Sequence, residues 1–471
     1  MPGSGNEFST PWHYRLVFFL GVISVQSLDF LIKNGAILTM ESRDSVIAGG
    51  YVGITGDCIT CIGSGGDCGF EAKKIIDAAG GLVLPGLING HTHAAMTLFR
   101  GLADDLPLMD WLNKYIFPVE NRMDGDFVRT GTLLACAEMI LSGTTTFCDM
   151  YLFEEETARA AREAGMRCLV GEVLYDFPSP NYGPLEKGFE YTESMIRKWR
   201  GDPLVSVAVE PHAVYTCSPH LLLSANRIAL ENDVPLIIHV AETLSEIEGV
   251  LAKYGKRPLE HLDSLGLLGP HLIADHCVHV EEEEIVRLAE RGVKVINNPE
   301  SNMKLASGIS PVPKLLSMGV TVGLGTDGCA SNNNLDLFGE MDTAAKIHKV
   351  RTMDPTVMDA FTVVKMATIN GAKALGMDAV TGSLVPGKKA DIIIVDTNKP
   401  HLTPMYDPYS HLVYAARGSD VSHAFINGQL VMEDRKLLTV DVSEIMERAR
   451  NKSRKVLEWV SPALVQAVER S

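Results

Sequence analysis

The 471-residue sequence lacks a surplus of positive charge. Its 42 lysines and arginines stand against 59 aspartates and glutamates, which gives a formal net charge of −17. Nucleic acids and anionic membrane surfaces are bound through basic patches, so we expect neither as a partner. The longest run of like charge is Glu281–Glu284, which we interpret as the start of a helix.

The sequence also lacks a hydrophobic run long enough to cross a membrane. Leu16–Val25 is apolar, but it is much shorter than the roughly 20 residues that a spanning helix needs. A secretory signal is the alternative interpretation, yet only Arg15 flanks the run and no clean small-x-small cleavage site follows. We therefore expect residues 1–27 to be a leader or tag-like tail outside the fold, and we favour a cytoplasmic location over export.

A disulfide framework is absent as well. The nine cysteines are odd in number and loosely spaced, which is typical of free thiols in a reducing compartment. Cys58 and Cys61 have the spacing of a redox or zinc-binding pair. No second pair and no nearby histidine accompanies them, so we interpret both as structural residues.

From Leu82 onward, short apolar strands alternate with amphipathic helical stretches. The predicted strands are Val83–Ile88, Thr144–Cys148, Arg167–Val173, Val205–Val209, Pro235–Ile238, Leu272–Ala274, Val293–Ile296 and Thr321–Leu324. The helical stretches between them include Arg129–Leu141, Glu154–Gly165, Pro219–Asn232 and Glu281–Gly292. Eight such repeats predict an α/β fold, a (β/α)₈ TIM-type barrel over residues 82–381. A doubly wound sheet is the alternative, but the glycine-rich phosphate turn that usually follows its first strand is missing.

Both ends of the chain carry a different pattern, made of short strands and turns. Leu28–Met40 contains Asn34-Gly35, and His423–Met432 contains Asn427-Gly428; each dipeptide is a strong hairpin signal. We expect residues 28–81 and 382–440 to form one small β-sandwich domain, with the barrel inserted between its halves. The pattern over 335–375 predicts mostly helix, and residues 441–471 are expected to end the chain as an amphipathic helix.

The chain is organised around an apolar run that ends in His91-Thr92-His93. On an extended strand, residues two apart point to the same face, so both imidazoles can reach one metal ion. Alone, such a pair is more often chance. However, the other predicted strands also end in polar residues, and a barrel places its catalytic groups at those ends. The strand-end residues are His91, His93, Asp149, Glu172, His212, His239, Glu242, His276, Asn298 and Asp327. Together they predict a metal centre. For Asp149 and Asn298 we favour the interpretation that they are hydrogen-bonded core residues.

Four motifs then resemble a known family. They are Pro-Gly-Leu-Ile-Asn-Gly-His-Thr-His (85–93), His-Val-Ala-Glu (239–242), Ala-Asp-His-Cys-Val-His (274–279) and Gly-Thr-Asp (325–327), joined by Leu-x-Pro-Gly-Lys-x-Ala-Asp at 384–391. Over residues 28–440 the sequence resembles the amidohydrolase superfamily, and within it the S-adenosylhomocysteine/5′-methylthioadenosine deaminase branch. By that resemblance, His91, His93, His239 and Asp327 bind one divalent metal ion, usually zinc. Two-metal members carry a lysine after the fourth strand; that place reads Val209-Glu210-Pro211-His212 here, so we expect a single metal.

The resemblance also implies catalytic roles. The carbon that bears the amine in adenine resists attack because addition breaks aromaticity, and protonation of the neighbouring ring nitrogen makes it electrophilic. Glu242 would supply that proton, and Asp327 would carry a proton from water to the leaving amine. His276 would orient the attacking hydroxide and stabilise the tetrahedral intermediate. Other zinc deaminases combine an activated water with a carboxylate in the same way.

Further positions bear on the substrate. By the resemblance, Glu120 binds the ribose hydroxyls and His212 contacts N7 of the purine. Trp111, in the loop after the first strand, and His279 are candidate pocket walls by position, and ordinary core residues are the equal alternative. The branch often carries an arginine for the substrate carboxylate after the third strand, where this chain has Glu172. We therefore expect a neutral 5′ substituent, as in 5′-methylthioadenosine, 5′-deoxyadenosine or adenosine, in preference to S-adenosylhomocysteine.

We thus expect hydrolytic deamination of an adenosine derivative to the inosine derivative and ammonia, by a homo-oligomer. One alternative is deamination of a guanine, pterin or cytosine-type ring, or hydrolysis of a triazine. Glu120 and His212 argue against it, because those substrates lack a ribose. The other is a metal-binding protein without catalysis, which the complete set of ligand positions and Glu242 make the weaker hypothesis.

Overall fold

The computed structural model describes residues 27–65, 69–102, 104–106 and 112–460. Residues 1–26 of the predicted leader lie outside these ranges, and so does Trp111. None of the helices in the described ranges has both the length and the apolar composition of a membrane span.

The centre of the molecule is built from two arcs of parallel strands. The first arc contains β6 (Leu87–Thr92), β7 (Thr144–Tyr151), β8 (Arg167–Leu174), β9 (Val205–Val207) and β10 (Glu210–Pro211), and the second contains β11 (Leu236–Val240), β12 (Leu272–His276), β13 (Lys294–Asn297) and β14 (Thr321–Leu324). Val209 N donates to Pro235 O (2.9 Å) at one junction of the arcs, and Asp327 N donates to His91 O (2.9 Å) at the other. Neighbouring strands follow chain order, unlike those of a doubly wound sheet.

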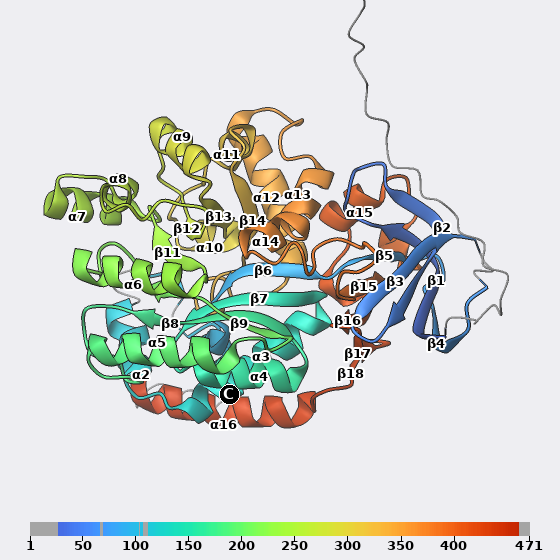
Figure 1. Ribbon diagram of the computed structural model, residues 1–471, viewed down its shortest axis with the longest axis horizontal. Coiled ribbons are helices and arrows are strands. Elements are labelled where there is room, and N and C mark those ends of the chain that lie inside the picture. Colours follow the sequence, from blue (N-terminus) through green and yellow to red (C-terminus); the bar gives the residue numbers. More distant parts are fainter. Residues whose placement is uncertain (1–26, 66–68, 103, 107–111, 461–471) are drawn as a thin grey trace, which may run out of the picture.

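Helices follow the strands and lie outside them (Figure 1). Those of the first half are η1 (Ala94–Phe99), η2 (Leu112–Ile116), α2 (Phe117–Glu120), α3 (Gly125–Leu141), α4 (Glu154–Ala164), α5 (Leu185–Trp199) and α6 (Pro219–Asn232). The second half adds α7 (Leu244–Tyr254), α8 (Pro258–Ser264), α9 (Glu282–Arg291), α10 (Pro299–Lys304), α11 (Val312–Ser317), α12 (Leu337–Thr352), α13 (Ala360–Met366) and α14 (Ile369–Ala374). Gly165 and Gly292 end α4 and α9 with positive φ angles of 74° and 69°, the left-handed cap that glycine adopts without strain.

A nine-stranded sheet lies beside the parallel strands, on the right in Figure 1, and draws on both ends of the chain. Its strands are β1 (Leu28–Leu38), β2 (Val46–Thr55), β3 (Cys58–Ser64), β4 (Ala72–Asp77), β5 (Leu82–Pro85), β15 (Ile392–Val395), β16 (Val421–Ile426), β17 (Gln429–Glu433) and β18 (Lys436–Leu437). The two halves meet where β5 pairs with both β1 and β15. The hairpin predicted at Asn427-Gly428 is confirmed, because β16 and β17 pair on either side of it.

Two sequence predictions about strands are wrong. Asn34-Gly35 is no hairpin turn; it is a bulge within β1, where Asn34 takes a φ of 60° and the strand changes partner from β4 to β5. The run Val83–Ile88 is two strands and not one. It breaks at Gly86, where a Cβ atom would lie 2.0 Å from Oγ1 of Thr145, so the neighbouring strand β7 forces glycine at this point.

The chain ends over the first half of the molecule. η3 (Pro400–Leu402), α15 (Pro408–Tyr414) and η4 (Gly418–Asp420) connect the last sheet strands, and α16 (Val442–Val460) then runs along the bottom of Figure 1. α16 packs on α3, where Arg448 lies 3.3 Å from Asp126. The predicted C-terminal helix is therefore present as far as residue 460.

Candidate metal centre and active site

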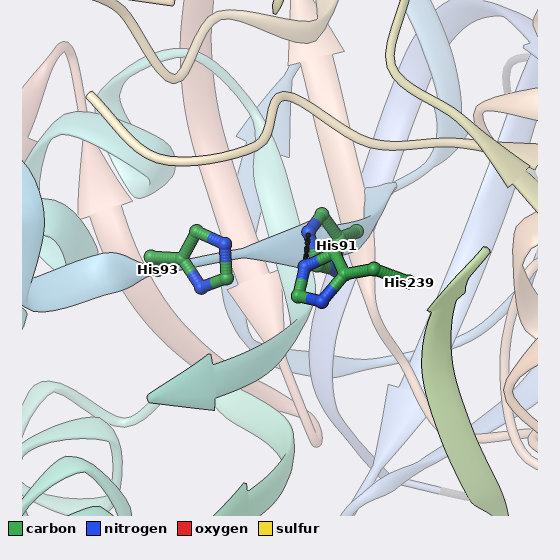
Figure 2. A group of neighbouring side chains, drawn as sticks. All are labelled: His91, His93 and His239. Atoms are coloured by element: carbon green, nitrogen blue, oxygen red, sulfur yellow. Dashed lines mark hydrogen bonds between the residues drawn. The ribbon is translucent and has the colours of Figure 1, made fainter. Parts of the chain in front are cut away.

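Four side chains from three different strand ends meet at one point. His91 lies on β6 and His93 just after it, His239 lies on β11, and Asp327 follows β14. Nε2 of His239 is 3.2 Å from Nε2 of His91, and Oδ1 of Asp327 is 3.2 Å from Nε2 of His93. Figure 2 shows the His91 and His239 rings side by side, with His93 facing them. Ligand atoms of the three histidines all lie within 4.8 Å of one another, as do those of a second group formed by His91, His276 and Asp327.

Each of the three clustered histidines is held by its other ring nitrogen. The contact partners of Nδ1 are Oδ2 of Asp275 for His91 (3.0 Å), the carbonyl oxygen of Met150 for His93, and the carbonyl oxygen of His212 for His239 (2.8 Å). The contact of Asp275 is an ion-pair contact, because its geometry falls short of a well-aligned hydrogen bond. Holding Nδ1 in this way directs the Nε2 lone pairs to a common point, as in metal sites whose histidines are oriented by outer partners.

The Asp327 carboxylate is fixed on both oxygens. Ser301 Oγ donates to Oδ2 at 2.6 Å, and the backbone N–H of Gly328 donates to Oδ1 at 2.7 Å. Asp327 itself has a φ of 61°, a conformation that non-glycine residues rarely adopt and that is common at functional sites.

The electrostatics of the cluster favour a cation. Burial disfavours the charged form of His91, but the carboxylates of Asp275 and Asp327 outweigh it and raise the pKa of His91 well above its usual value. Burial also opposes ionisation of Asp327, yet His91 and His93 hold its pKa well below the usual range. The pKa of His239 is depressed by burial and by the neighbouring histidines, so this imidazole is neutral and able to ligate. Three imidazoles and one carboxylate are a donor set that suits zinc and similar divalent metals.

Two further polar groups stand beside the cluster and line the same cavity. His276, at the end of β12, lies with Nδ1 2.9 Å from Oδ1 of Asn302 and has a φ of 69°. Glu242, on the turn after β11, is half-buried, and Ser307 Oγ donates to its Oε1 at 3.4 Å. A carboxyl group and an imidazole therefore flank the point where the four clustered groups meet.

The cavity is lined by both polar and apolar side chains. Its lining residues are His93, Met96, Ile116, Phe117, Glu120, Met150, Tyr151, Leu152, Val173, Tyr175, Phe177, His212, Tyr215, His239, Glu242, His276, Leu305, Asp327 and Ser331. Neither lysine nor arginine occurs among these described lining residues. Tyr175 and Phe177 stack with ring centroids 3.9 Å apart; Phe177 is 43% exposed, whereas Tyr175 is buried.

Glu120 and His212 both reach this cavity, as the sequence predicts. Tyr151 Oη donates to Oε1 of Glu120 at 2.8 Å. Burial raises the pKa of Glu120 to about 7, although the hydrogen bond from Tyr151 works in the opposite direction. Burial, followed by His93, lowers the pKa of His212 to about 4, so His212 is neutral near pH 7. Its Nδ1 lies 2.8 Å from Oγ1 of Thr216, which leaves Nε2 for a ligand.

The structure places other candidate residues away from the cavity. Glu172 is 1% exposed and accepts from the backbone N–H of Glu154 and from Nδ2 of Asn181, both at 2.9 Å. It therefore caps the start of α4, and its placement gives no support to a role at the 5′ end of a substrate. His279 donates through Nε2 to the carbonyl oxygen of Ser307 (2.7 Å) and is not a lining residue.

Asp149 and Asn298 act as hydrogen-bonded core residues. Oδ1 of Asp149 accepts from Thr92 Oγ1 and from the backbone N–H of Ala94, both at 2.6 Å, and so braces the segment that carries His91 and His93. Asn298 Nδ2 lies 3.4 Å from Nδ1 of His276.

Sequence reasoning missed four residues that hold side chains of the site in place. Asp275 and Ser301 contact His91 and Asp327 of the cluster, whereas Asn302 contacts His276 and Tyr151 contacts Glu120. A signal for Asp275 was present, because it is a charged residue inside the apolar run of β12, where it pairs in register with His239. The signals for Ser301 and Asn302 are weak, because polar residues at a helix start are common for other reasons.

Comparisons with known proteins agree with this geometry. The family model described as "Amidohydrolase family" matches residues 82–431. A 5-methylthioadenosine/S-adenosylhomocysteine deaminase of Syntrophobacter fumaroxidans is 62% identical over 90% of this chain and 97% of its own length. A 5′-deoxyadenosine deaminase of Methanosarcina mazei is 46% identical over 92% and 99%. The structure of an adenosine deaminase from Xanthomonas campestris with bound zinc is 38% identical, with a TM-score of 0.90 over 91% of this chain and 99% of that one. Since the family model covers most of the chain and the relatives match over nearly their whole lengths, this protein belongs to the amidohydrolase family.

Proposed function

We propose that the protein is a metal-dependent deaminase that converts an adenosine derivative and water to the inosine derivative and ammonia. The observation that carries this proposal is the meeting of His91, His93, His239 and Asp327 beside the carboxyl group of Glu242. The relatives named above are deaminases of adenosine derivatives, which supports the same reaction.

His91, His93, His239 and Asp327 are the residues that would hold one divalent metal, which we propose to be Zn²⁺. Such a metal lowers the pKa of its bound water from about 15.7 toward about 7, which supplies hydroxide at neutral pH. The three nitrogen donors, the single carboxylate and the outer partner on each histidine all fit that role.

The protein's own residues then manage the protons. Glu242 gives a proton to the ring nitrogen next to the carbon that carries the amine, so that this carbon accepts the attack of water. Asp327 takes one proton from the water and passes it to the amine. The carbon–nitrogen bond then breaks, ammonia departs, and the proton left on the new hydroxyl group returns to Glu242, which gives the inosine derivative. His276, which lines the same cavity, hydrogen-bonds to the oxygen of the attacking water. General acid–base steps of this kind contribute about 10²- to 10⁴-fold to a rate.

Glu120 and His212 are proposed to orient the nucleoside. The Glu120 carboxylate, held by Tyr151, would accept hydrogen bonds from the ribose hydroxyls. His212 can donate to N7 of the purine through Nε2 when the hydroxyl of Thr216 donates to its Nδ1. Trp111, Glu172 and His279 stay without a proposed contact to substrate, since Trp111 is outside the described residues and the other two are not lining residues.

A neutral 5′ substituent is proposed, on different grounds from those that the sequence offered. The amine-bearing carbon of a purine and its ribose lie at opposite ends, so the 5′ group points from the metal centre toward the exposed end of the cavity. The described lining of the cavity includes the apolar and aromatic side chains of Leu152, Val173, Tyr175 and Phe177 and no basic side chain. A charged amino-acid group would lose its hydration without gaining a partner, which disfavours S-adenosylhomocysteine.

We also propose that the two arcs close into one (β/α)₈ barrel and that the nine-stranded sheet folds into a small β-sandwich domain. The boundary between them moves from residue 82 to Gly86, because β5 pairs within the nine-stranded sheet. Cytoplasmic location and homo-oligomeric assembly stay predictions.

The direct test is the change in adenine-type ultraviolet absorbance when metal-loaded protein meets 5′-methylthioadenosine, 5′-deoxyadenosine, adenosine, S-adenosylhomocysteine and free adenine in parallel. We expect turnover of the neutral nucleosides, slower turnover of S-adenosylhomocysteine and none of adenine. Turnover of free adenine at a nucleoside-like rate would contradict ribose recognition by Glu120. Inactivity toward all five would refute the proposed function and leave a free heterocycle, such as a triazine, to be tested.

A further inference from the structure

The proposed proton donor sits on an unusual turn. Glu242 follows Ala241, which has a φ of 56° and is fully buried. A side chain with a Cβ atom rarely adopts this left-handed conformation, and it persists only where surrounding contacts impose it. The contacts that impose it here come from Glu246 and His279.

Glu246 holds the turn through its backbone. This residue lies in the first turn of α7 and is 6% exposed. Its Oε1 accepts from the backbone N–H of Ala241 at 2.9 Å, and its Oε2 accepts from the backbone N–H of Glu242 at 2.8 Å. Each oxygen of one carboxyl group therefore fixes one of two consecutive amides. Burial raises the pKa of Glu246 to about 7, although these two hydrogen bonds work in the opposite direction.

His279 and Ser307 support the turn from the other side. The backbone N–H of His279 donates to Ala241 O at 2.8 Å, and its Nε2 donates to Ser307 O at 2.7 Å. Ser307 Oγ in turn donates to Oε1 of Glu242 at 3.4 Å. The carbonyl group of Ala241 is thus tied to His279 and the carboxyl group of Glu242 to Ser307, and His279 and Ser307 are bonded to each other.

We infer that Glu246 is a positioning residue for the proton donor Glu242, with His279 and Ser307 completing its support. This inference rests on the proposed function, which gives Glu242 its role. Neither Glu246 nor His279 lines the cavity, so both act through Glu242 and not on the substrate. Proton transfer needs donor and acceptor within about 2.6–3.2 Å, and a displacement of about 1 Å can cost about 10²-fold in rate.

Replacing Glu246 by glutamine tests this role at constant shape. The amide keeps one acceptor oxygen, but its NH₂ group faces the second backbone N–H, which loses its partner. We expect kcat to fall at least about tenfold with KM within about threefold, because the ribose and purine contacts are untouched. Metal content should match the wild type, since the four proposed ligands are not altered.

A matched control is available in Asp336, at the start of α12. Its carboxylate also accepts from two backbone N–H groups, those of Phe338 (3.0 Å) and Gly418 (3.2 Å), but it is not a lining residue of the cavity. Asp336→Asn should leave kcat within about twofold of the wild type, even where it lowers stability. An equal loss of kcat in both variants would show a general effect of stability and overturn the inference.

The double variant decides how Glu246 acts. In a Glu242→Gln background the group to be positioned can no longer give its proton, so adding Glu246→Gln should cost little further activity. The same fold-loss in both backgrounds, or a single Glu246→Gln variant with wild-type kcat, would overturn the inference. If Glu246→Gln does not fold, Glu246→Asp, whose carboxylate reaches less far, is expected to lower kcat with KM nearly unchanged, and a wild-type kcat there would overturn it equally. If the wild-type protein turns over no nucleoside, the proposed function is refuted and the inference falls with it. If the wild type is active and the Glu246 variants keep its kcat, only the inference is refuted.

Discussion

The effect of a buried carboxyl group on the free energy of unfolding can be measured at Glu172. The side chain is 1% exposed, and its two oxygens are bound by the N–H of Glu154 and the amide of Asn181. Burial raises the pKa of Glu172 from 4.5 to about 7, against the effect of these hydrogen bonds. Glutamine at this position keeps the shape and one acceptor oxygen, and the Asn181 amide can turn to meet the new NH₂ group. Glu172→Gln therefore removes the ionisation and keeps most of the packing.

The sign follows from proton linkage. Between pH 4.5 and about 7 the folded protein holds a proton on Glu172 that the unfolded chain releases, so this group's contribution to stability is full at low pH and is lost as the pH rises to about 7. At about 1.4 kcal/mol per pH unit, the whole change is about 3 kcal/mol. Glu172→Gln has no carboxyl group at this position, so its free energy of unfolding lacks this pH-dependent contribution. Relative to the wild type, its free energy of unfolding should rise by roughly 2–3 kcal/mol between pH 5 and pH 8.

Urea unfolding at constant temperature, followed by circular dichroism at several pH values, gives this difference. Other titrating groups occur in both proteins and cancel in the comparison. The exposed Glu260 serves as the control, and Glu260→Gln should show no such pH-dependent difference. A difference between wild type and Glu172→Gln that stays flat from pH 5 to pH 8 would refute the raised pKa and the capping role assigned here.

Three further predictions concern the site and the small sheet. Asp275→Asn should weaken metal binding by about 10- to 100-fold in chelator competition, because His91 loses the carboxylate that orients it; unchanged affinity would contradict that role. Tyr151→Phe removes the hydrogen bond that lowers the pKa of Glu120, so KM for nucleosides should rise near pH 7 and approach the wild-type value at higher pH; a pH-independent effect would exclude this cause. Gly428→Ala should destabilise by more than about 1 kcal/mol in urea unfolding, since its φ is 77° and a Cβ would lie 2.1 Å from backbone oxygen; wild-type stability would show that the turn can rearrange.

Local pattern pointed to the strand-end residues that lie together in the structure, and the family resemblance proposed them as metal ligands. His91, His239 and Asp327 each end or follow an apolar strand, and parallel strands bring such ends to one edge whatever the loops do. The same logic located Glu242, which follows His239 on the same turn. The positions of these groups depend on strand order alone, and the alternation of strands and helices is visible in the sequence.

Contacts between distant segments could not be predicted in this way. The resemblance suggested a substrate contact at Glu172, but the direction of this side chain is set by the start of α4 and by Asn181, and the structure does not support the contact. His279 turns toward Ser307 for a similar reason. The break at Gly86 depends on Thr145, far along the chain, and single-sequence periodicity carries no record of that crowding.

The junction at Gly86 also limits how this protein can be taken apart. The strand that carries His91, β6, follows β5 after the single residue Gly86, and β5 is paired with both β1 and β15. The backbone N–H of Gly86 donates to Asp391 O at 3.0 Å. Asp391 is in turn paired with the buried Arg167 of β8 at 2.8 Å. The nine-stranded sheet is thus joined directly to the strand that carries His91 of the candidate metal centre. Recombination between relatives, or a designed chimera, would have to carry β1, β5 and β15 together with the histidine strand.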